Sequence, residues 1–309
     1  MSRFTLIAAV IIVTFSISIP SWAISDRLTV VASVFPLFDF AREVAGSAAD
    51  VRLLLPPGVD PHSWEPKPSD IVDLSRADIF LYTSDKMEPW AGSIGRAVKG
   101  RNIVILQVMS SLGFNTTDKS YKAAGAGETV KDHGEDPHFW LDLSLSGRAA
   151  QVIGQTLIGN DPGNRDSYAS RALEYAGQLE KLDQAFKEGL EDCDSRKLVT
   201  GGHAAFGHLA RRYDLEQVSV YGLSPDAEPS PRHLAGIVNL VRENSVRTVF
   251  SEEMMNPRMA QVLSQETGTK VRTLNPGANL TVAQWRSGVT FFDLMRKNLD
   301  TLKEGLGCE

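Results

Sequence analysis

Short apolar runs alternate with amphipathic segments along the first half of the chain. The β-rich apolar runs are residues 28–34, 51–55, 79–82 and 103–106. Between them, residues 36–45 and 69–77 have the apolar spacing of helices, and Ser69 is the expected N-cap of the second helix. Such alternation predicts βα units built around a mainly parallel sheet.

The second half repeats this pattern. Its predicted strands are residues 197–200, 217–221, 248–250 and 270–274, and its predicted helices are residues 204–213, 231–243, 257–267 and 289–302. Because strands and helices alternate again, we expect a second α/β lobe. The fold class predicted from the pattern is therefore α/β, with two βα lobes.

A long proline-free segment, residues 164–191, separates the halves. Leu173, Leu179, Leu182 and Phe186 recur along it at helical spacing, and 28 helical residues would extend about 40 Å. We expect one long helix, and the alternative is two helices with a break near Gly177. The expected boundaries are a first lobe over residues 24–162, a linking helix over 163–191 and a second lobe over 192–309.

The first 23 residues have the organisation of a secretory signal peptide. Arg3 precedes an apolar run over residues 4–19, and Ser21 and Ala23 supply small side chains at a cleavage site. A membrane anchor is the alternative, but the run is shorter than the ~20 residues of a bilayer span. No cysteine follows Ala23 directly, so lipid attachment at that point is not expected.

Composition and charge narrow the function. The chain has 309 residues, of which 42% are hydrophobic and 23% charged, as in globular proteins of about two domains. The net charge is −6, which disfavours a nucleic-acid partner held by a basic surface. We found no phosphate-binding loop, dinucleotide-binding loop, nucleophile elbow or His-Glu-x-x-His helix in the sequence.

The two cysteines are Cys193 and Cys308. In an exported protein we expect them to form a disulfide bond that ties the C-terminal tail to the chain near Cys193. The alternative is one surface thiol and one buried thiol. A thiolate metal site is not favoured, because neither cysteine has a partner at ligand spacing.

Three of the six histidines occupy loops that suit a binding site. His62 and His138 each follow Asp-Pro and precede a tryptophan by two positions, so a stiff loop presents each imidazole. Asp60 and Asp136 are placed to orient those rings or their loops. His203 lies where a predicted strand ends and a helix begins, which is where ligand sites gather in open α/β sheets. We therefore predict that these three loops converge on a metal ion.

The other three histidines have weaker signals. His208 lies five residues beyond His203 on a predicted helix, away from its face, and is interpreted as structural or surface. His233 is interpreted as a surface residue at a helix start. His133 belongs to an aperiodic loop over residues 115–134, where it is a candidate for contacting a metal in transit.

The sequence resembles the zinc- and manganese-binding solute-binding proteins of ABC importers, known as cluster A-I. The segments that carry the resemblance are residues 60–70, 136–142, 203–207, 223–230, 249–252 and 292–299, in that order. It implies two α/β lobes joined by one rigid helix, with a metal in the cleft between them. It also implies that the protein captures the ion in the periplasm and delivers it to a membrane permease.

Carried over by position, the resemblance makes His62, His138 and His203 the metal ligands. Many relatives place an aspartate after the last strand, where residues 274–279 contain no carboxylate. Glu252 is the candidate for a direct or water-mediated fourth contact. A water molecule is the competing ligand, and the glutamate would then be a buried hydrogen-bond acceptor.

Three imidazoles with at most one carboxylate favour zinc, whereas manganese prefers more oxygen ligands. The predicted function is therefore zinc binding without catalysis, by a monomer. The predicted partners are a permease and, as a further possibility, a periplasmic metal donor. A manganese- or iron-binding member of the same family is the first alternative. A zinc hydrolase with Glu252 as its base is the second.

Overall fold

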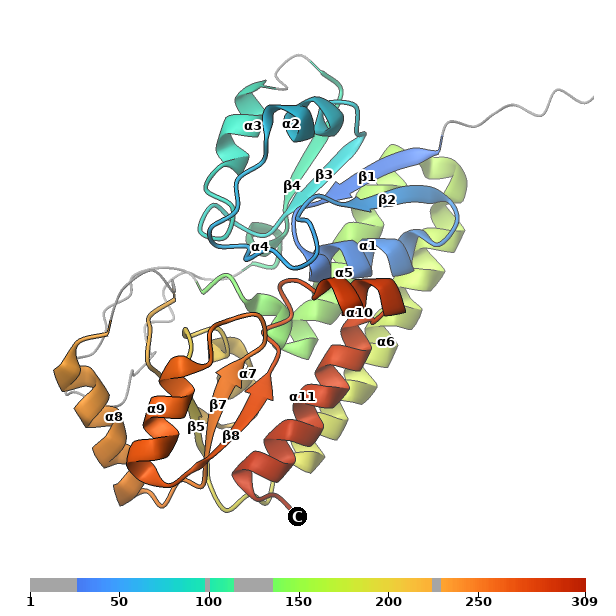
Figure 1. Cartoon of the computed structure of the whole chain (residues 1–309). Coiled ribbons are helices and arrows are strands. Elements are labelled where there is room, and N and C mark those ends of the chain that lie inside the picture. Colours follow the sequence, from blue (N-terminus) through green and yellow to red (C-terminus); the bar gives the residue numbers. More distant parts are fainter. Residues whose placement is uncertain (1–26, 98–100, 114–135, 224–228) are drawn as a thin grey trace, which may run out of the picture.

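Two separate parallel sheets organise the chain in the computed structural model, which describes residues 27–97, 101–113, 136–223 and 229–309 (Figure 1). The first sheet has the order β2-β1-β3-β4, and the second has the matching order β6-β5-β7-β8. The strands are β1 (Leu28–Ala32), β2 (Ala49–Leu53), β3 (Ile79–Tyr82), β4 (Val104–Gln107), β5 (Lys197–Thr200), β6 (Glu216–Ser219), β7 (Thr248–Glu252) and β8 (Lys270–Leu274). All strand pairs are parallel, as the alternating pattern predicted.

Helices cover both sheets and join them. The first half contains α1 (Phe35–Ala45), α2 (Pro68–Leu74), α3 (Ala91–Ala97), α4 (Val108–Ser111), the 3-10 helix η1 (Phe139–Leu141), α5 (Leu143–Asn160) and the 3-10 helix η2 (Pro162–Asn164). The linking helix is α6 (Arg165–Gly189), and the second half contains α7 (Gly207–Arg212), α8 (Pro231–Glu243), α9 (Arg258–Thr267), α10 (Val282–Ser287) and α11 (Phe291–Leu306). The two-lobed α/β class is thereby confirmed.

Several helix boundaries differ from the sequence prediction. Helix α2 begins at Pro68 and its N-cap is Lys67, so the assignment of Ser69 as N-cap is wrong. The Asp70 carboxylate accepts a hydrogen bond from the Lys67 backbone amide, and this bond closes the first turn. Helix α7 begins at Gly207, because the residues before it form the turn that contains His203.

The linking helix α6 is a single helix that continues through Gly177, as expected, and the alternative of a break there does not occur. Its 25 residues correspond to about 38 Å, and it runs beside both lobes (Figure 1). Leu179, Leu182 and Phe186 are buried as predicted, but Leu173 is 66% exposed. The neighbouring Ala172 occupies the buried stripe instead, about 100° further round the helix.

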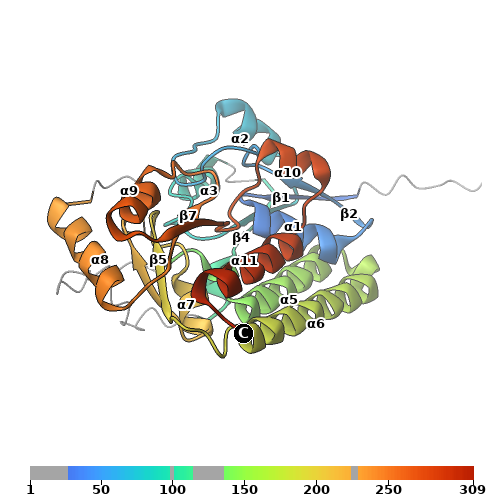
Figure 2. The same ribbon diagram turned by 60° about the horizontal axis from the view of Figure 1, so that its bottom comes forward.

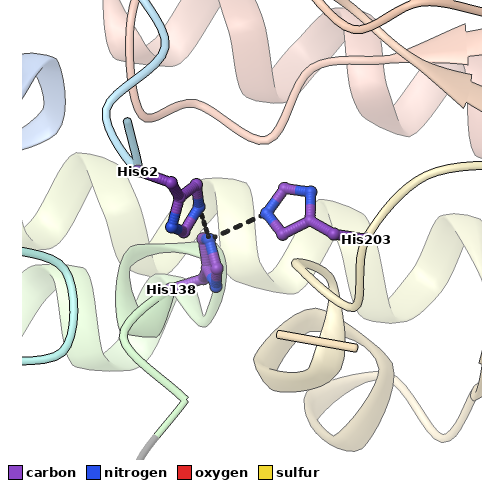
Figure 3. A group of neighbouring side chains, drawn as sticks. All are labelled: His62, His138 and His203. Carbon is purple, nitrogen blue, oxygen red and sulfur yellow. Dashed lines mark hydrogen bonds between the residues drawn. The ribbon is translucent and has the colours of Figure 1, made fainter. Parts of the chain in front are cut away.

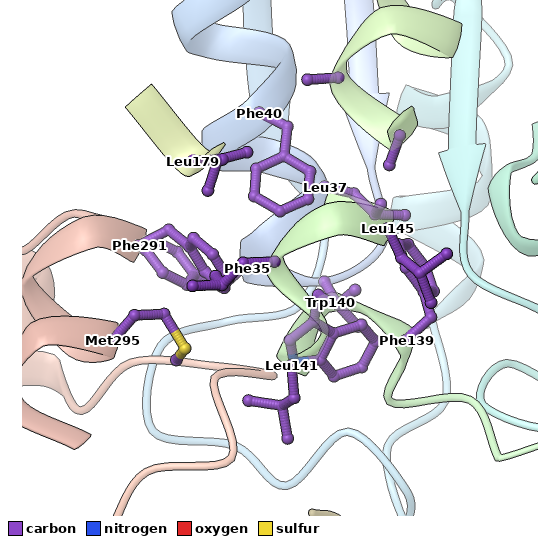
Figure 4. Packing of buried hydrophobic residues seen from close by; sticks show 14 of the residues in the cluster. Phe35, Leu37, Phe40, Phe139, Trp140, Leu141, Leu145, Leu179, Phe291 and Met295 are labelled. Carbon is purple, nitrogen blue, oxygen red and sulfur yellow. The ribbon is translucent and has the colours of Figure 1, made fainter. Parts of the chain in front are cut away.

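The largest hydrophobic core extends from the first lobe across the linking helix into the second lobe. Helices α1, α5, α6 and α11 lie side by side (Figure 2) and bury their apolar faces against one another. Phe40 of α1 meets Phe291 of α11 edge to face, with ring centroids 5.0 Å apart (Figure 4). Because both lobes contribute to this core, their relative position is fixed by packing as well as by α6.

Cys193 and Cys308 form a disulfide bond, as the sequence predicted. The bond joins the chain just after α6 to the end of α11. Backbone hydrogen bonds from Asp194 to Gly307 and from Ser195 to Leu306, each 3.1 Å long, continue the same attachment. The C-terminal tail is therefore held against the end of the linking helix.

The predicted signal peptide, residues 1–23, lies outside the described residues and stays a prediction. Among the helices that the structure does describe, none combines the length and the apolar character needed to cross a bilayer.

Candidate metal centre

The three histidines singled out by the sequence come together between the lobes (Figure 3). His62 lies in the loop between β2 and α2, His138 is the N-cap residue of η1, and His203 lies in the turn between β5 and α7. The Nε2 atom of His138 is 3.4 Å from Nε2 of His62 and 3.2 Å from Nε2 of His203. One ring nitrogen from each histidine lies within 4.8 Å of the others.

His138 is fixed by the aspartate two residues before it. The Oδ1 atom of Asp136 accepts hydrogen bonds from the His138 backbone amide at 3.0 Å and from its Nδ1 at 2.9 Å. A proton held at Nδ1 leaves the lone pair at Nε2, on the side of the other histidines. The proline between the two residues stiffens this turn, as the Asp-Pro-His motif predicted.

Asp60 braces the His62 loop in a different way. Its Oδ1 atom accepts from the His62 backbone amide at 3.0 Å, and its Oδ2 atom accepts from the Ser63 hydroxyl at 3.3 Å. The two Asp-Pro-His motifs therefore share the backbone contact. Only Asp136 also contacts the imidazole of its own motif.

Glu252 contacts His203 on the side away from the other two rings. Its Oε2 atom lies 2.6 Å from His203 Nδ1, although the two groups are not aligned as in a linear hydrogen bond. His203 follows β5 and Glu252 ends β7, the strands on either side of the point where the strand order reverses. Gly202 permits this approach, because a Cβ atom there would overlap the carboxylate.

Burial and charge set the protonation of the three rings. Burial is the main cause, and the neighbouring histidines the second, of a His62 pKa that is lowered to about 2. Burial also lowers the pKa of His138, against the opposing effect of Asp136. Burial lowers the pKa of His203 too, but the Glu252 carboxylate outweighs it and the net shift is upward. Two of the three imidazoles are thus neutral at pH 7 and available as ligands.

The three rings open onto a cavity of about 70 Å³. Asp60 and Pro61 of the first lobe also line it, and the remaining walls come from the second lobe, from residues 252–255 at the end of β7 and from Asn275, Pro276, Ala278 and Asn279 after β8. The segment 275–279 is the one in which the sequence contains no carboxylate. Met254 and Met255 also line the cavity and were not among the predicted site residues. Their position just after the end of β7 is the signal that could have identified them.

The remaining histidines lie outside this group. His208 is buried, and its Nε2 atom donates to the Asp136 backbone carbonyl at 3.0 Å. Of the two roles considered for it, structural or surface, the structure shows the structural one. His233 lies in the first turn of α8, is half-buried, and its Nε2 atom contacts the Ser219 carbonyl at 3.0 Å. His133 and its loop lie outside the described residues.

The donor set suits a borderline metal ion. Within the part of the chain that the structure describes, the close group consists of three imidazoles and contains no carboxylate. Three nitrogen donors with room for a fourth ligand match the coordination of zinc. Ions that prefer oxygen, such as manganese and magnesium, find few donors here.

Comparison with known proteins agrees with the geometry. Residues 30–305 match the family model described as the periplasmic component A of the zinc-uptake complex, ZnuA. The chain belongs to this family. It is 32% identical over 282 residues to the high-affinity zinc uptake system protein ZnuA of Bacillus subtilis, covering 91% of this chain and 88% of that protein.

A streptococcal protein and the solved structure of one of its domains are also similar to this chain. The zinc-binding lipoprotein AdcA of Streptococcus pneumoniae is 31% identical over 313 residues, and the match covers 98% of this chain but only 61% of AdcA. The solved Zn(II)-bound ZnuA-like domain of that AdcA aligns with a TM-score of 0.74 and 31% identity. That alignment covers 91% of this chain and 99% of the domain.

Proposed function

We propose that this protein is the zinc-binding component of an ABC metal importer. It captures zinc outside the inner membrane and delivers the ion to a membrane permease. The observation that carries the proposal is the convergence of three imidazole nitrogens within 4.8 Å, from loops of both lobes. Membership of the zinc-uptake family supports the same reading.

In this proposal His62, His138 and His203 bind the ion through Nε2. Asp136 and Glu252 hold the opposite nitrogen of their histidines, so they orient the rings and add two negative charges near the cation. A water molecule in the cavity supplies the fourth ligand. Glu252 as a direct ligand fits less well, because its nearest oxygen faces Nδ1 of His203.

The alternatives are less well supported by the same geometry. A hydrolase requires a base directed at the metal-bound water, whereas Glu252 is directed at an imidazole. A manganese or iron carrier would require more oxygen donors than the described group offers. We therefore infer a binding protein without catalytic activity, with zinc as its cargo.

Location and partners follow from the proposal. Cleavage of residues 1–23 would release a protein that has no cysteine at its new N-terminus and is therefore free in the periplasm. We propose a monomer with lobes over residues 24–162 and 192–309, joined by residues 163–191. A permease receives the ion, and a periplasmic donor would be the partner for the loop that contains His133.

The test is titration of metal-free protein with zinc in competition with a chelator. We expect one tight site per chain, and elemental analysis should find zinc in preference to manganese and iron after exposure to all three. His62→Ala, His138→Ala and His203→Ala should each weaken binding by at least tenfold, because each removes one ligand.

His233→Ala is the matched control, since His233 lies in the second lobe outside the cluster and should leave affinity unchanged. The proposal would be contradicted if the wild-type protein had no tight one-to-one zinc site. It would also be contradicted if the three ligand variants bound zinc as tightly as wild type and His233→Ala.

A further inference from the structure

One segment of the second lobe reaches across to the first lobe beside the histidines. Residues 275–280 follow β8 and lead to α10, which lies against α1 of the first lobe (Figure 1). Trp285 of α10 packs on Phe38 of α1 with ring centroids 5.3 Å apart. The segment is therefore part of the second lobe in the sequence, but it leads into a helix that packs against the first lobe.

Its beginning is anchored in the second lobe. The Asn275 backbone amide donates to Asn298 Oδ1 at 2.9 Å, and Asn298 Nδ2 donates back to the Asn275 carbonyl at 2.7 Å. The Asn275 side chain donates to Glu253 and accepts from the Gly277 amide. These bonds fix the start of the segment to α11 and to the end of β7.

Its end is bound to the loop that contains His62. Asn279 Nδ2 donates to the backbone carbonyls of Pro56 and Val59, each at 2.8 Å. Its Oδ1 atom accepts from the Leu280 amide, and the Leu280 carbonyl accepts from Gly58 at 2.8 Å. Asn279 is 3% exposed, so water does not replace these bonds.

The same segment also contacts the loop that contains His138. The indole Nε1 atom of Trp140 donates to the Pro276 carbonyl at 2.8 Å. The Trp140 ring in turn packs edge to face on the His138 imidazole, with centroids 5.5 Å apart. Both histidine loops of the first lobe are thus attached to one segment of the second.

We propose that Asn279 is a positioning residue for the metal site. It holds the turn before Asp60 so that His62 faces His138 and His203 before the ion arrives. This rests on the proposed function, because its effect is exerted on zinc. Opening the site for release then requires this attachment to loosen, in addition to any movement of the lobes.

The experiment measures zinc dissociation from the full-length protein into an excess of a chromophoric chelator. Asn279→Ala removes both side-chain donors but keeps the Gly58–Leu280 backbone bond, so we expect a folded protein. Its zinc should dissociate about 10–100 times faster, the range seen when the partner of a metal ligand is lost. The visible spectrum of the cobalt-loaded variant should also change, which a change in stability alone would not cause.

Two variants separate positioning from general destabilisation. Tyr213→Phe removes a buried hydrogen bond to Asp183 of α6 in which the segment takes no part, and should lower the unfolding midpoint while leaving zinc dissociation unchanged. Asn244→Ala removes an asparagine bond to the Leu240 carbonyl on α8 and should change neither. Should Asn279→Ala fail to fold, Asn279→Ser keeps one donor and should show a smaller acceleration.

Zinc dissociation from the Asn279 variants within twofold of wild type, with an unchanged cobalt spectrum, would overturn the assignment. A wild-type protein without a tight zinc site would instead contradict the proposed function and, with it, the role of Asn279. The wild-type titration therefore precedes the comparison of the variants.

Discussion

At the scale of single residues, the site separates the atoms that face the metal from the charges that balance it. The imidazole Nε2 atoms converge, whereas the carboxylates of Asp136 and Glu252 lie on the outer nitrogens of His138 and His203. The two negative charges match the charge of a divalent cation without occupying its ligand positions. This arrangement leaves the cavity side open for a water molecule.

Glu252→Gln tests that division of roles. The change keeps the shape of the side chain but removes the charge next to His203, so zinc affinity should fall about 10–100-fold. Competitive zinc titration measures the loss. The cobalt-loaded variant should keep a spectrum of the wild-type form, because Glu252 supplies no ligand atom.

Glu216→Gln is the control, since Glu216 pairs with Lys197 on the outer part of the second lobe and should leave the affinity unaltered. A Glu252→Gln spectrum with a different coordination geometry would show that the glutamate is a direct ligand, and the orienting role would then be abandoned.

Sequence reasoning identified the three histidines and the two aspartates that hold the His62 and His138 loops, but not the contact of Glu252 with His203 Nδ1. The repeated Asp-Pro-His motif and the strand-end position of His203 are local features that can be read from the sequence. The contact between Glu252 and Nδ1 depends on the rotamers of two residues about 50 positions apart and on the absence of a side chain at Gly202. The attachment made by Asn279 joins residues more than 200 positions apart, and no local pattern signals it.

At the scale of elements, strands were predicted better than helices. The parallel strands are short apolar runs that the pattern identifies directly. Helix α5 (Leu143–Asn160) contains three glycines, two serines and one threonine, so its helical propensity is weak. Its packing against α6 and α1 stabilises it, which is tertiary information that the sequence does not display.

Two glycines in this helix pair should respond in opposite ways to alanine. Gly177 of α6 has open space around a Cβ position, so Gly177→Ala should raise the free energy of unfolding by about 0.5–1 kcal/mol. Gly154 of α5 faces α6, and a Cβ atom there would lie 2.9 Å from the Ala172 Cβ. Gly154→Ala should therefore destabilise the protein by about 1–3 kcal/mol through overpacking.

Urea unfolding of the metal-free protein measures both changes. Gly159→Ala, at an open position near the end of α5, is the control for the effect of helix propensity alone in the same helix. It should not lower the free energy of unfolding. Equal effects at Gly154 and Gly177 would show that the two helices are not as closely packed as described.

At the scale of the whole molecule, a buried carboxylate joins the helices that hold the lobes together. Asp39 of α1 is fully buried and pairs with Arg42 at 2.6 Å. Its other oxygen accepts from the Phe291 amide at the start of α11 at 3.0 Å and from the Tyr175 hydroxyl of α6 at 3.4 Å. One residue thus connects the first lobe, the linking helix and the last helix of the second lobe.

Burial raises the pKa of Asp39 from 3.8 to about 6, against the opposing charge of Arg42. Because the folded protein then binds the proton more tightly than the unfolded chain, Asp39 contributes stability that is fully present below pH 3.8 and is lost as pH rises through about 6.

Asp39→Asn should remove this pH dependence of stability. The difference in unfolding free energy between wild type and variant should therefore change between pH 4 and 6, by at most ~1.4 kcal/mol per pH unit. Taking the difference cancels the contributions of other groups whose pKa changes on folding, among them Glu88, whose pKa burial raises to about 7, and His138 and His208, whose pKa values burial lowers. Urea unfolding of both proteins between pH 4 and 6 measures this difference in unfolding free energy. A difference that stays constant with pH would mean that Asp39 does not change its protonation state in this range.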